Sequence, residues 1–412
     1  MSFQAERKRL LDAYQAAIRV VGGRECVARY LSSNDVEFVT HVAAVGKAAI
    51  HMAAGALDVI GDRVESVLVV TKRGYNEPLF KPGDPVTVME SSHPVPDQRS
   101  LEAGAALEKF VRTAPADAGL LLLVSGGASS LMEVLPEGVA EDNLTRINSW
   151  LLASGLAIGA MNRVRKRVSR VKGGRLAEAL GGRRALCLMI SDVPGDDPKV
   201  IGSGPLVPHV ADDIDVSDLR LPDWLEAIAD KAPPLTDSRL FDNVRLEIVA
   251  RPADARNAAG KALATASRQV KAHGELLEGD AREVGASIAR RLMQGPPGAE
   301  IWASETTVVL PESPGRGGRC QSFALAAALE IAGRDDIVLL AAGTDGTDGP
   351  GEDAGALVDG DTVNRGRLAG LDPRRCLEGA DAGSFLDASG DLLHTGPTGT
   401  NVMDLIIGSK ID

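Results

Sequence analysis

The sequence predicts an α/β protein of two domains, the first built on a doubly wound parallel sheet. Apolar segments alternate with amphipathic ones along the first half of the chain, as βα units do. Four apolar runs end in small polar clusters, which is typical of parallel strands buried on both faces. These runs and clusters lie at 44–47, 120–130, 186–197 and 338–349. A chain of 412 residues is long enough for two or three domains.

The first domain is expected to cover residues 1–240. It begins with an amphipathic helix over 4–21 that Gly22 and Gly23 end. Strands are predicted at 37–46, 66–71, 119–124 and 185–190, and helices at 47–60, at 101–113 and, as a pair, over 141–180. The segment between the second of these strands and the helix at 101–113 is polar and includes SSHPVPDQRS at 91–100.

The second domain is expected to cover residues 241–412. A proline- and aspartate-rich segment at 205–240 places the boundary near residue 240. Strands are predicted at 244–250, 300–310, 336–342 and 354–359, and helices near 253–273, 281–294 and 321–332. Strands that follow one another directly indicate a mixed sheet. A loop rich in Gly, Thr and Pro is expected to enter a last helix at about Thr400–Asn401.

Composition and charge argue against several classes of function. The net charge of −12 and the pI of about 5.1 disfavour non-specific binding to nucleic acid or to acidic membranes. The six histidines and four cysteines are scattered without zinc or disulfide spacing, which suits a reducing compartment. The N-terminus lacks the pattern of a signal peptide, and no apolar run is long enough to span a membrane. We therefore expect a cytoplasmic protein.

Several common nucleotide-binding and catalytic motifs are missing from the chain. It has no Walker A motif and no G-x-G-x-x-G after a strand. It also has no kinase HRD or DFG set and no G-x-S-x-G. A site for phosphorylated ligands would have to be built in another way.

An anion site is predicted where the first two of these apolar runs end. SGGASS at 125–130 follows a strand, and Gly126 and Gly127 can expose backbone amides beside Ser125 and Ser129. The alternative is a tight turn with a serine helix cap. Lys47 lies at a predicted helix start, where its charge opposes the macrodipole, so it is suited to meeting an anion. The alternative is a solvated lysine.

Acidic residues follow the other two apolar runs. Asp192 comes directly after a strand, where a carboxylate could accept a proton from a hydroxyl or hold Mg²⁺. Ordinary turn chemistry is the alternative, and it is favoured for Asp196 and Asp197. Asp345 and Asp348 in GTDGTDGPGED are hard oxygen ligands suited to Mg²⁺. A polar loop is the alternative for them.

Basic and hydroxyl side chains supply further candidates for binding anions. Arg319 lies on a glycine-rich loop before a helix, and its guanidinium suits carboxylate or phosphate oxygens. The segment 161–180 is expected to be an amphipathic helix with a solvated basic face, from which Lys172 is the best candidate to reach a ligand. Thr398 and Asn401 would offer hydroxyl and amide contacts at a helix N-terminus.

Taken together, these segments resemble the type II glycerate kinase family, the glycerate 2-kinases with a C-terminal MOFRL domain, many of which carry the name hydroxypyruvate reductase. The resemblance covers roughly residues 8–408 and rests on eight motifs in the same order. They are AVGKAA, SSHPVPD, LVSGGASSL, NRVRKRVSRVKGGRLA, ISDVPGDDPKVIGSGP, GRGGRCQSFALAAA, AGTDGTDGPGEDAGA and HTGPTGTNVMDL.

The resemblance implies a fold, a reaction and a set of residues. The fold would be a Rossmann-like domain followed by a MOFRL domain, with the active site in the cleft between them. The reaction would be ATP-dependent phosphorylation of D-glycerate to 2-phosphoglycerate with Mg²⁺. Lys47, Asp192 and Arg319 would be the catalytic residues, because AVGK, ISDVPGD and GRGGR match around them. We expect small-molecule partners only, and a monomer or homodimer.

The chain departs from the family pattern at a few positions, and two other functions stay open. ASET replaces GGET at 303–306, GRCQS replaces GRNQE around Cys320, and Met403 replaces a polar residue. One alternative is NAD(P)H-dependent reduction of hydroxypyruvate, against which the missing dinucleotide motif speaks. The other is a non-catalytic protein that binds a phosphorylated metabolite.

Overall fold

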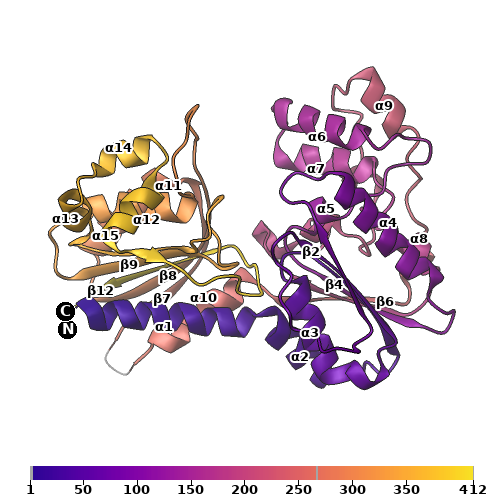
Figure 1. Cartoon of the computed structure of the whole chain (residues 1–412), viewed down its shortest axis with the longest axis horizontal. Coiled ribbons are helices and arrows are strands. Elements are labelled where there is room, and N and C mark those ends of the chain that lie inside the picture. The colour runs from indigo at the N-terminus through magenta and orange to yellow at the C-terminus, as the bar shows by residue number, and fades with distance from the viewer. Residues whose placement is uncertain (1–2, 266–267, 412) are drawn as a thin grey trace. The chain divides into compact units, whose positions relative to one another are not determined.

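The computed structural model describes residues 3–265 and 268–411, and the chain divides into two compact units. One unit is Gly23–Val249, which we call the sheet-one unit. The other joins Met1–Gly22 to Ala250–Asp412, and we call it the sheet-two unit. Both are α/β units, as the sequence predicts (Figure 1). None of the described helices combines the length and the apolar character needed to cross a membrane.

The sheet-one unit is built on a six-stranded sheet in the order β3-β2-β1-β4-β5-β6. Its strands are β1 (Val39–Val45), β2 (Ser66–Lys72), β3 (Val86–Ser91), β4 (Gly119–Val124), β5 (Ala185–Ile190) and β6 (Val244–Ala250). The pairs from β3 through β5 are parallel. Every residue of β4 and β5 is buried, because helices pack on both faces of the sheet. The doubly wound sheet expected from the alternating pattern is confirmed.

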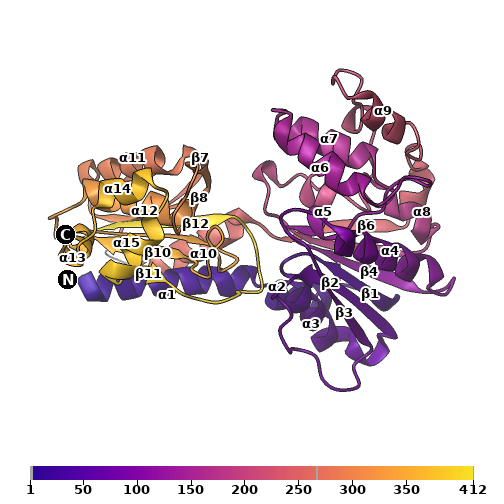
Figure 2. The same cartoon turned by 45° about the horizontal axis from the view of Figure 1, so that its top comes forward.

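Helices cover both faces of this sheet (Figure 2). On one side lie α2 (Gly23–Ser32) and α3 (Ala49–Ile60), and on the other α4 (Gln98–Thr113), α5 (Ala128–Leu131) and α8 (Leu176–Leu180). A smaller apolar core joins α6 (Asn143–Ala153), α7 (Ile158–Arg167) and α9 (Asp223–Ala229). The basic segment 161–180 is therefore not one helix: it is helical to Arg167 in α7 and again over Leu176–Leu180 in α8. Its valines Val164, Val168 and Val171 are buried as expected.

The sheet-two unit contains a mixed six-stranded sheet in the order β11-β10-β9-β12-β8-β7. Among the described residues of this sheet, β7 and β8 pair in parallel, whereas β8 with β12, β12 with β9, β9 with β10 and β10 with β11 pair antiparallel. The strands are β7 (Val270–Asp280), β8 (Gly298–Thr307), β9 (Ile337–Gly343), β10 (Gly355–Asp359), β11 (Leu392–Leu393) and β12 (Asp404–Lys410). This confirms the expected mixed sheet.

Helices also lie on both faces of the mixed sheet (Figure 1). The N-terminal helix α1 (Phe3–Val21) and α10 (Pro252–Leu263) cover one face. The other face carries α11 (Ala281–Gln294), α12 (Arg319–Glu330), α13 (Thr362–Leu368), α14 (Pro373–Glu378) and α15 (Ala382–Ser389). Its core includes the large buried side chains Trp302, Phe323 and Phe385.

Helix α1 belongs to the unit formed by the C-terminal part of the chain. Its side chains Leu10 and Tyr14 are buried, and the Tyr14 hydroxyl donates to the carbonyl of Gly343 at 2.7 Å. Arg7 pairs with Asp359 at 2.6 Å and with Asp391 at 2.9 Å. We expected the first domain to begin at residue 1. Because of these contacts, α1 belongs instead to the sheet-two unit.

The end of the first domain also differs from the expected boundary near residue 240. Strand β6 (Val244–Ala250), which we assigned to the second domain, extends the first sheet beside β5. The chain therefore passes to the sheet-two unit near residue 250. The proline and aspartate residues indicated the irregular segment that precedes β6. They could not show that β6 pairs with β5, because these two strands are far apart in the sequence.

Four strands were missed or assigned to another element type. β3 lies in the segment read only as polar, because its side chains are largely half-buried or exposed. β7 was read partly as a helix over 253–273, and β11 is only two residues long. The helix expected from Thr400–Asn401 is wrong: that segment leads into β12, which is buried between β9 and β8. Short apolar runs do not distinguish buried strands from helices.

Replacing Leu10 tests the attachment of α1. Leu10 is fully buried, so Leu10→Ala is expected to lower the free energy of unfolding by about 2–5 kcal/mol through lost burial and a residual cavity. The matched control is Val20→Ala on the exposed side of the same helix, with an effect of about 0.5 kcal/mol or less. Urea unfolding of the full chain measures both. Equal effects of the two changes would contradict the packing of α1 described above.

Candidate functional site

The first group of candidate residues, which we call the strand-end cluster, consists of Lys47, the loop 125–130 and Asp192. These residues follow the carboxyl ends of β1, β4 and β5, which are neighbours in the sheet. Val45 pairs with Val124, and Val124 pairs with Met189, so the three strands end at the same edge. The structure thus brings these predicted residues to one side of the unit.

The strand-end cluster lies at the point where the order of the strands reverses. From β1 the chain proceeds outward to β2 and β3, whereas β4, β5 and β6 extend in the other direction. Open α/β sheets bind ligands outside the strand ends at such a switch point. Lys47 and the loop 125–130 follow the two strands that flank it.

Backbone contacts lock the two loops at the switch point together. The Lys47 amide donates to the carbonyl of Gly126 at 2.9 Å, and the Ala48 amide donates to Oγ of Ser125 at 3.1 Å. Gly46 has a φ of 134°, and a Cβ at this position would lie 2.1 Å from Oγ of Ser125. A side chain at residue 46 would therefore push the loops apart.

Lys47 and His93 both approach the glycine turn of the loop 125–130. A Cβ on Gly127, which has a φ of 85°, would lie 3.0 Å from Cδ2 of His93 and 3.4 Å from Cγ of Lys47. His93 follows β3 within the SSHPVPD motif. We assigned this histidine no role from the sequence, although the motif was a signal that could have identified it.

The loop 125–130 presents backbone amides in the way an anion site requires. Within the described residues, the amides of Gly126, Gly127 and Ser129 have no carbonyl acceptor. Helix α5 begins at Ala128 without a side-chain cap, which excludes the predicted alternative of a serine cap. The hydroxyl of Ser129 is instead hydrogen-bonded to that of Ser203 at 2.8 Å. Amides directed outward at a glycine turn can bind phosphate oxygens.

Lys172 does not offer a charge to a ligand as the sequence suggested. Its side chain is buried and its ammonium group forms an ion pair with the buried carboxylate of Glu133. Other basic residues of this segment also have acidic partners, as Arg163 has in Asp218 at 2.8 Å. The plain interpretation of an amphipathic helix with a polar face is closer to the structure than a phosphate site at Lys172.

The second group, which we call the Arg319 cluster, consists of Arg319, Glu305, Asp404, Asp345 and Asp348. Arg319 is the first residue of α12, and its guanidinium pairs with Asp404, the first residue of β12, at 2.6 Å. It also pairs with Glu305 near the end of β8. Burial alone would lower the pKa of Arg319, but these two carboxylates raise it above its usual value. Sequence reasoning identified Arg319 but neither carboxylate.

Asp348 caps the helix that carries Arg319. Its two carboxylate oxygens accept the amides of Cys320 at 3.0 Å and Gln321 at 2.8 Å, the second and third residues of α12. Burial, together with the charge of Asp404, raises the pKa of Asp348 to about 7. Burial likewise raises the pKa of Asp404, although Arg319 opposes this effect.

The predicted Mg²⁺ ligands Asp345 and Asp348 hold turns and helix ends instead of forming a metal cage. Oδ1 of Asp345 accepts the amide of Thr347 at 3.0 Å and its hydroxyl at 3.1 Å. In the part of the chain that the structure describes, no group of three or more His, Cys, Asp or Glu side chains is arranged to hold a metal ion. Asp348, with both oxygens engaged by amides, does not fit a metal site.

The loop with Thr398 and Asn401 precedes a strand and so lacks the helix N-terminus expected there. The hydroxyl of Thr398 donates to the carbonyl of Thr344 at 2.5 Å, and that of Thr400 donates to the carbonyl of Val21 at 2.6 Å. Asn401 is buried. The two threonine hydroxyls therefore fasten this loop to its own unit.

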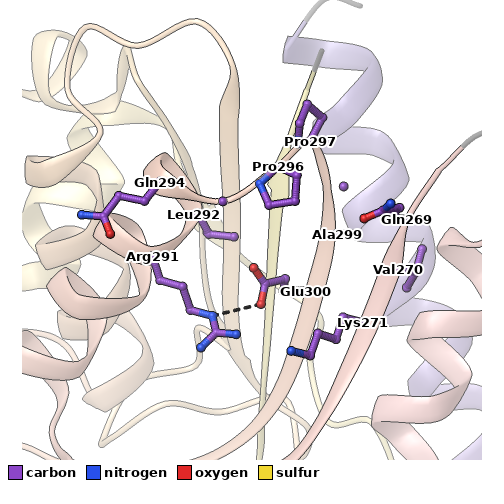
Figure 3. Close-up of a pocket in the computed structure, with 12 residues that line it drawn as sticks. Gln269, Val270, Lys271, Arg291, Leu292, Gln294, Pro296, Pro297, Ala299 and Glu300 are labelled. Carbon is purple, nitrogen blue, oxygen red and sulfur yellow. Dashed lines mark hydrogen bonds and ion pairs between the residues drawn. The ribbon is translucent and has the colours of Figure 1, made fainter.

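A wide pocket elsewhere in the sheet-two unit contains none of the predicted residues. It has a volume of about 660 Å³ and lies between the starts of β7 and β8 and the end of α11. Figure 3 shows Arg291 and Glu300 in this pocket, paired at 3.0 Å. This pocket lies at the amino ends of β7 and β8, whereas Glu305 of the Arg319 cluster lies near the carboxyl end of β8.

Comparisons with known proteins match nearly the whole chain. Residues 9–220 match the family model "Domain of unknown function (DUF4147)", and residues 298–404 match the MOFRL family. D-glycerate 2-kinase of Thermotoga maritima is 35% identical over 417 residues, which cover 98% of each chain. A putative hydroxypyruvate reductase of Agrobacterium vitis is 37% identical over 88% of this chain and 97% of its own. A crystal structure of glycerate kinase from T. maritima matches 99% of this chain and all of its own, with a TM-score of 0.86 and 34% identity.

The pKa of Asp348 predicts a pH-dependent stability. At pH values between its ordinary pKa of 3.8 and its folded value of about 7, the Asp348 carboxyl group is ionised in the unfolded chain but protonated in the folded protein. The free energy of unfolding therefore falls as pH rises from about 4 to 7, by up to about 4 kcal/mol from this group. Asp348→Asn, which has no ionisable group, is expected to remove that decrease.

Urea unfolding of wild type and variant across this pH range measures the difference between them. Asp335→Asn, at an exposed position of the same unit, is the control. Parallel pH profiles for wild type and Asp348→Asn would show that Asp348 is already ionised in the folded protein at low pH.

Proposed function

We propose that this chain phosphorylates D-glycerate with ATP to give 2-phosphoglycerate. The chain belongs to the glycerate kinase family, and it contains the DUF4147 and MOFRL domains. The observation that carries this proposal is the strand-end cluster. A lysine, a glycine turn with available amides and a carboxylate stand at the switch point of a parallel sheet. Phosphoryl transfer requires positioning and charge neutralisation more than covalent chemistry.

Phosphate binding is assigned to the loop 125–130 and Lys47. The amides of Gly126, Gly127 and Ser129 would bind phosphate oxygens of ATP, since they lack carbonyl acceptors among the described residues. Lys47 approaches the same turn through its Cγ and would neutralise charge on the transferred phosphoryl group. His93, whose Cδ2 also approaches this turn, would help to orient that group.

The acceptor is assigned to Asp192, which would orient or deprotonate the C2 hydroxyl of D-glycerate. Asp192 is half-buried and follows the strand beside β4. Arg319 would bind an anionic group of a substrate, and its ion pairs with Glu305 and Asp404 fix its direction.

Mg²⁺ is expected to enter with the nucleotide, where it neutralises charge on phosphate oxygens. The described residues contain no group of side chains that could hold a metal ion without the nucleotide. The roles given above are therefore assigned to protein side chains and backbone amides. Asp345 and Asp348 are not assigned to the ion.

Reduction of hydroxypyruvate is the second candidate, because A. vitis relatives carry that name. The loop after β1 reads VGKAA instead of the glycine motif that dinucleotides require.

A direct assay separates the two reactions. With ATP, Mg²⁺ and D-glycerate, phosphorus NMR is expected to show 2-phosphoglycerate and ADP. Loss of NADH absorbance with hydroxypyruvate and no phosphorylated product would favour the reductase, whereas ligand binding without turnover would favour a binding protein.

Removing the charge of Lys47 tests the strand-end cluster. Lys47→Met keeps most of the side-chain length and is expected to lower kcat/KM by on the order of 10²-fold or more. Lys8→Met changes an exposed lysine of α1, which pairs with Asp12, and is expected to leave kinetics unchanged. Activity near that of wild type in folded Lys47→Met would remove Lys47 from the mechanism.

A further inference from the structure

The turn Ile201–Ser203 packs against the loop 125–130 of the strand-end cluster. A Cβ on Gly202 would lie 2.7 Å from Cγ1 of Val124, the last residue of β4, and 3.1 Å from Cβ of Ala128 in the loop. Only glycine permits so close an approach of the backbone. The turn belongs to the motif ISDVPGDDPKVIGSGP, and the roles assigned above do not involve this part of the motif.

Ser203 adopts a backbone conformation that is unfavourable for its residue type. Its φ is 63°, in the left-handed region that residues with a Cβ rarely occupy. The glycines on either side, Gly202 and Gly204, have φ values of 57° and 59° and adopt them without this cost. The Gly173 amide donates to the Ser203 carbonyl at 2.9 Å and holds the strained residue in place. Strain of this kind is concentrated at functional sites.

The side chain of Ser203 is hydrogen-bonded to the loop 125–130. Its Oγ is buried and lies 2.8 Å from Oγ of Ser129. Within residues 3–265 and 268–411, neither hydroxyl is hydrogen-bonded to a further group. Each hydroxyl carries one proton, so Ser203 can donate to Ser129 while Ser129 keeps its own proton for another acceptor. Ser129 is half-buried, so this proton can reach a ligand at the loop.

We propose that Ser203 is a positioning residue that directs the hydroxyl of Ser129 toward a phosphate oxygen of ATP. This inference rests on the proposed function, which already assigns the Ser129 amide to phosphate oxygens. Serine side chains in turns commonly accept amides of their own turn, which would occupy the amides that the nucleotide needs. The hydrogen bond from Ser203 engages the Ser129 oxygen instead, so the loop amides and the Ser129 proton remain available to the nucleotide.

Removing the Ser203 hydroxyl in two ways separates its role from the strain of the backbone. Ser203→Ala keeps the Cβ, whereas Ser203→Gly also permits the left-handed φ without strain and should be at least as stable to urea as Ser203→Ala. Both changes are expected to raise the KM for ATP, and the calorimetric Kd of the non-hydrolysable analogue adenylyl imidodiphosphate with Mg²⁺, by about tenfold. The KM for D-glycerate should change by less than about twofold. Ala380→Gly relieves a comparable φ of 51° in the sheet-two unit and, as the matched control, should leave these constants unchanged.

A double-mutant cycle with Ser129→Ala tests whether Ser203 acts through Ser129. If it does, Ser129→Ala alone weakens binding of the analogue by about tenfold, and adding Ser203→Ala changes the Kd by less than about twofold. Single effects that multiply to about 100-fold in the double variant would overturn the proposal. So would an unchanged Kd in folded Ser203→Ala and Ser203→Gly, or an increase confined to the KM for D-glycerate. Wild-type protein that binds the analogue with the expected dependence on Ser203 but forms no 2-phosphoglycerate would refute the proposed function and uphold the positioning role.

Discussion

The contact between Gly46 and Ser125 fixes the geometry on which the candidate site depends. The chain leaves β1 and β4 side by side at the switch point, and there backbone amides of one loop donate to the Gly126 carbonyl and the Ser125 hydroxyl of the other. The absence of a side chain at residue 46 permits this approach. As a result, Lys47 is held beside a turn whose amides remain available. A parallel sheet alone would position the strand ends, but it would not bring these particular groups into contact.

Charge is handled differently in the two units. In the strand-end cluster, backbone amides and Lys47 create a region suited to an anion. In the Arg319 cluster, Glu305 and Asp404 flank Arg319, and Asp348 caps the helix below it. The buried carboxylates there lose solvation, so that their pKa values rise. Arg319 is therefore held rigidly, with its charge largely balanced by the protein.

Sequence patterns predicted both sheets and most helices, because strands buried on both faces are strongly apolar and amphipathic helices are periodic. They also identified Lys47 and the loop 125–130, since glycine and polar residues after a buried strand have a clear structural meaning. The attachment of α1, the pairing of β6 and the carboxylates around Arg319 could not be predicted. Each depends on contacts between residues far apart in the chain, as between Arg7 and Asp359. Lys172 was misjudged because its partner Glu133 lies 39 residues earlier in the chain, outside the basic segment.

The location of α1 has a consequence for biosynthesis. This helix is translated before the sheet-one unit, yet it contacts β9 and β12, which are translated after that unit. At about 5–20 residues per second, the apolar face with Leu10 and Tyr14 waits tens of seconds for its docking surface. During that interval the intervening sheet-one unit can fold on the ribosome, because domains generally fold as units during synthesis. The second unit can complete its core only after β12 has been synthesised.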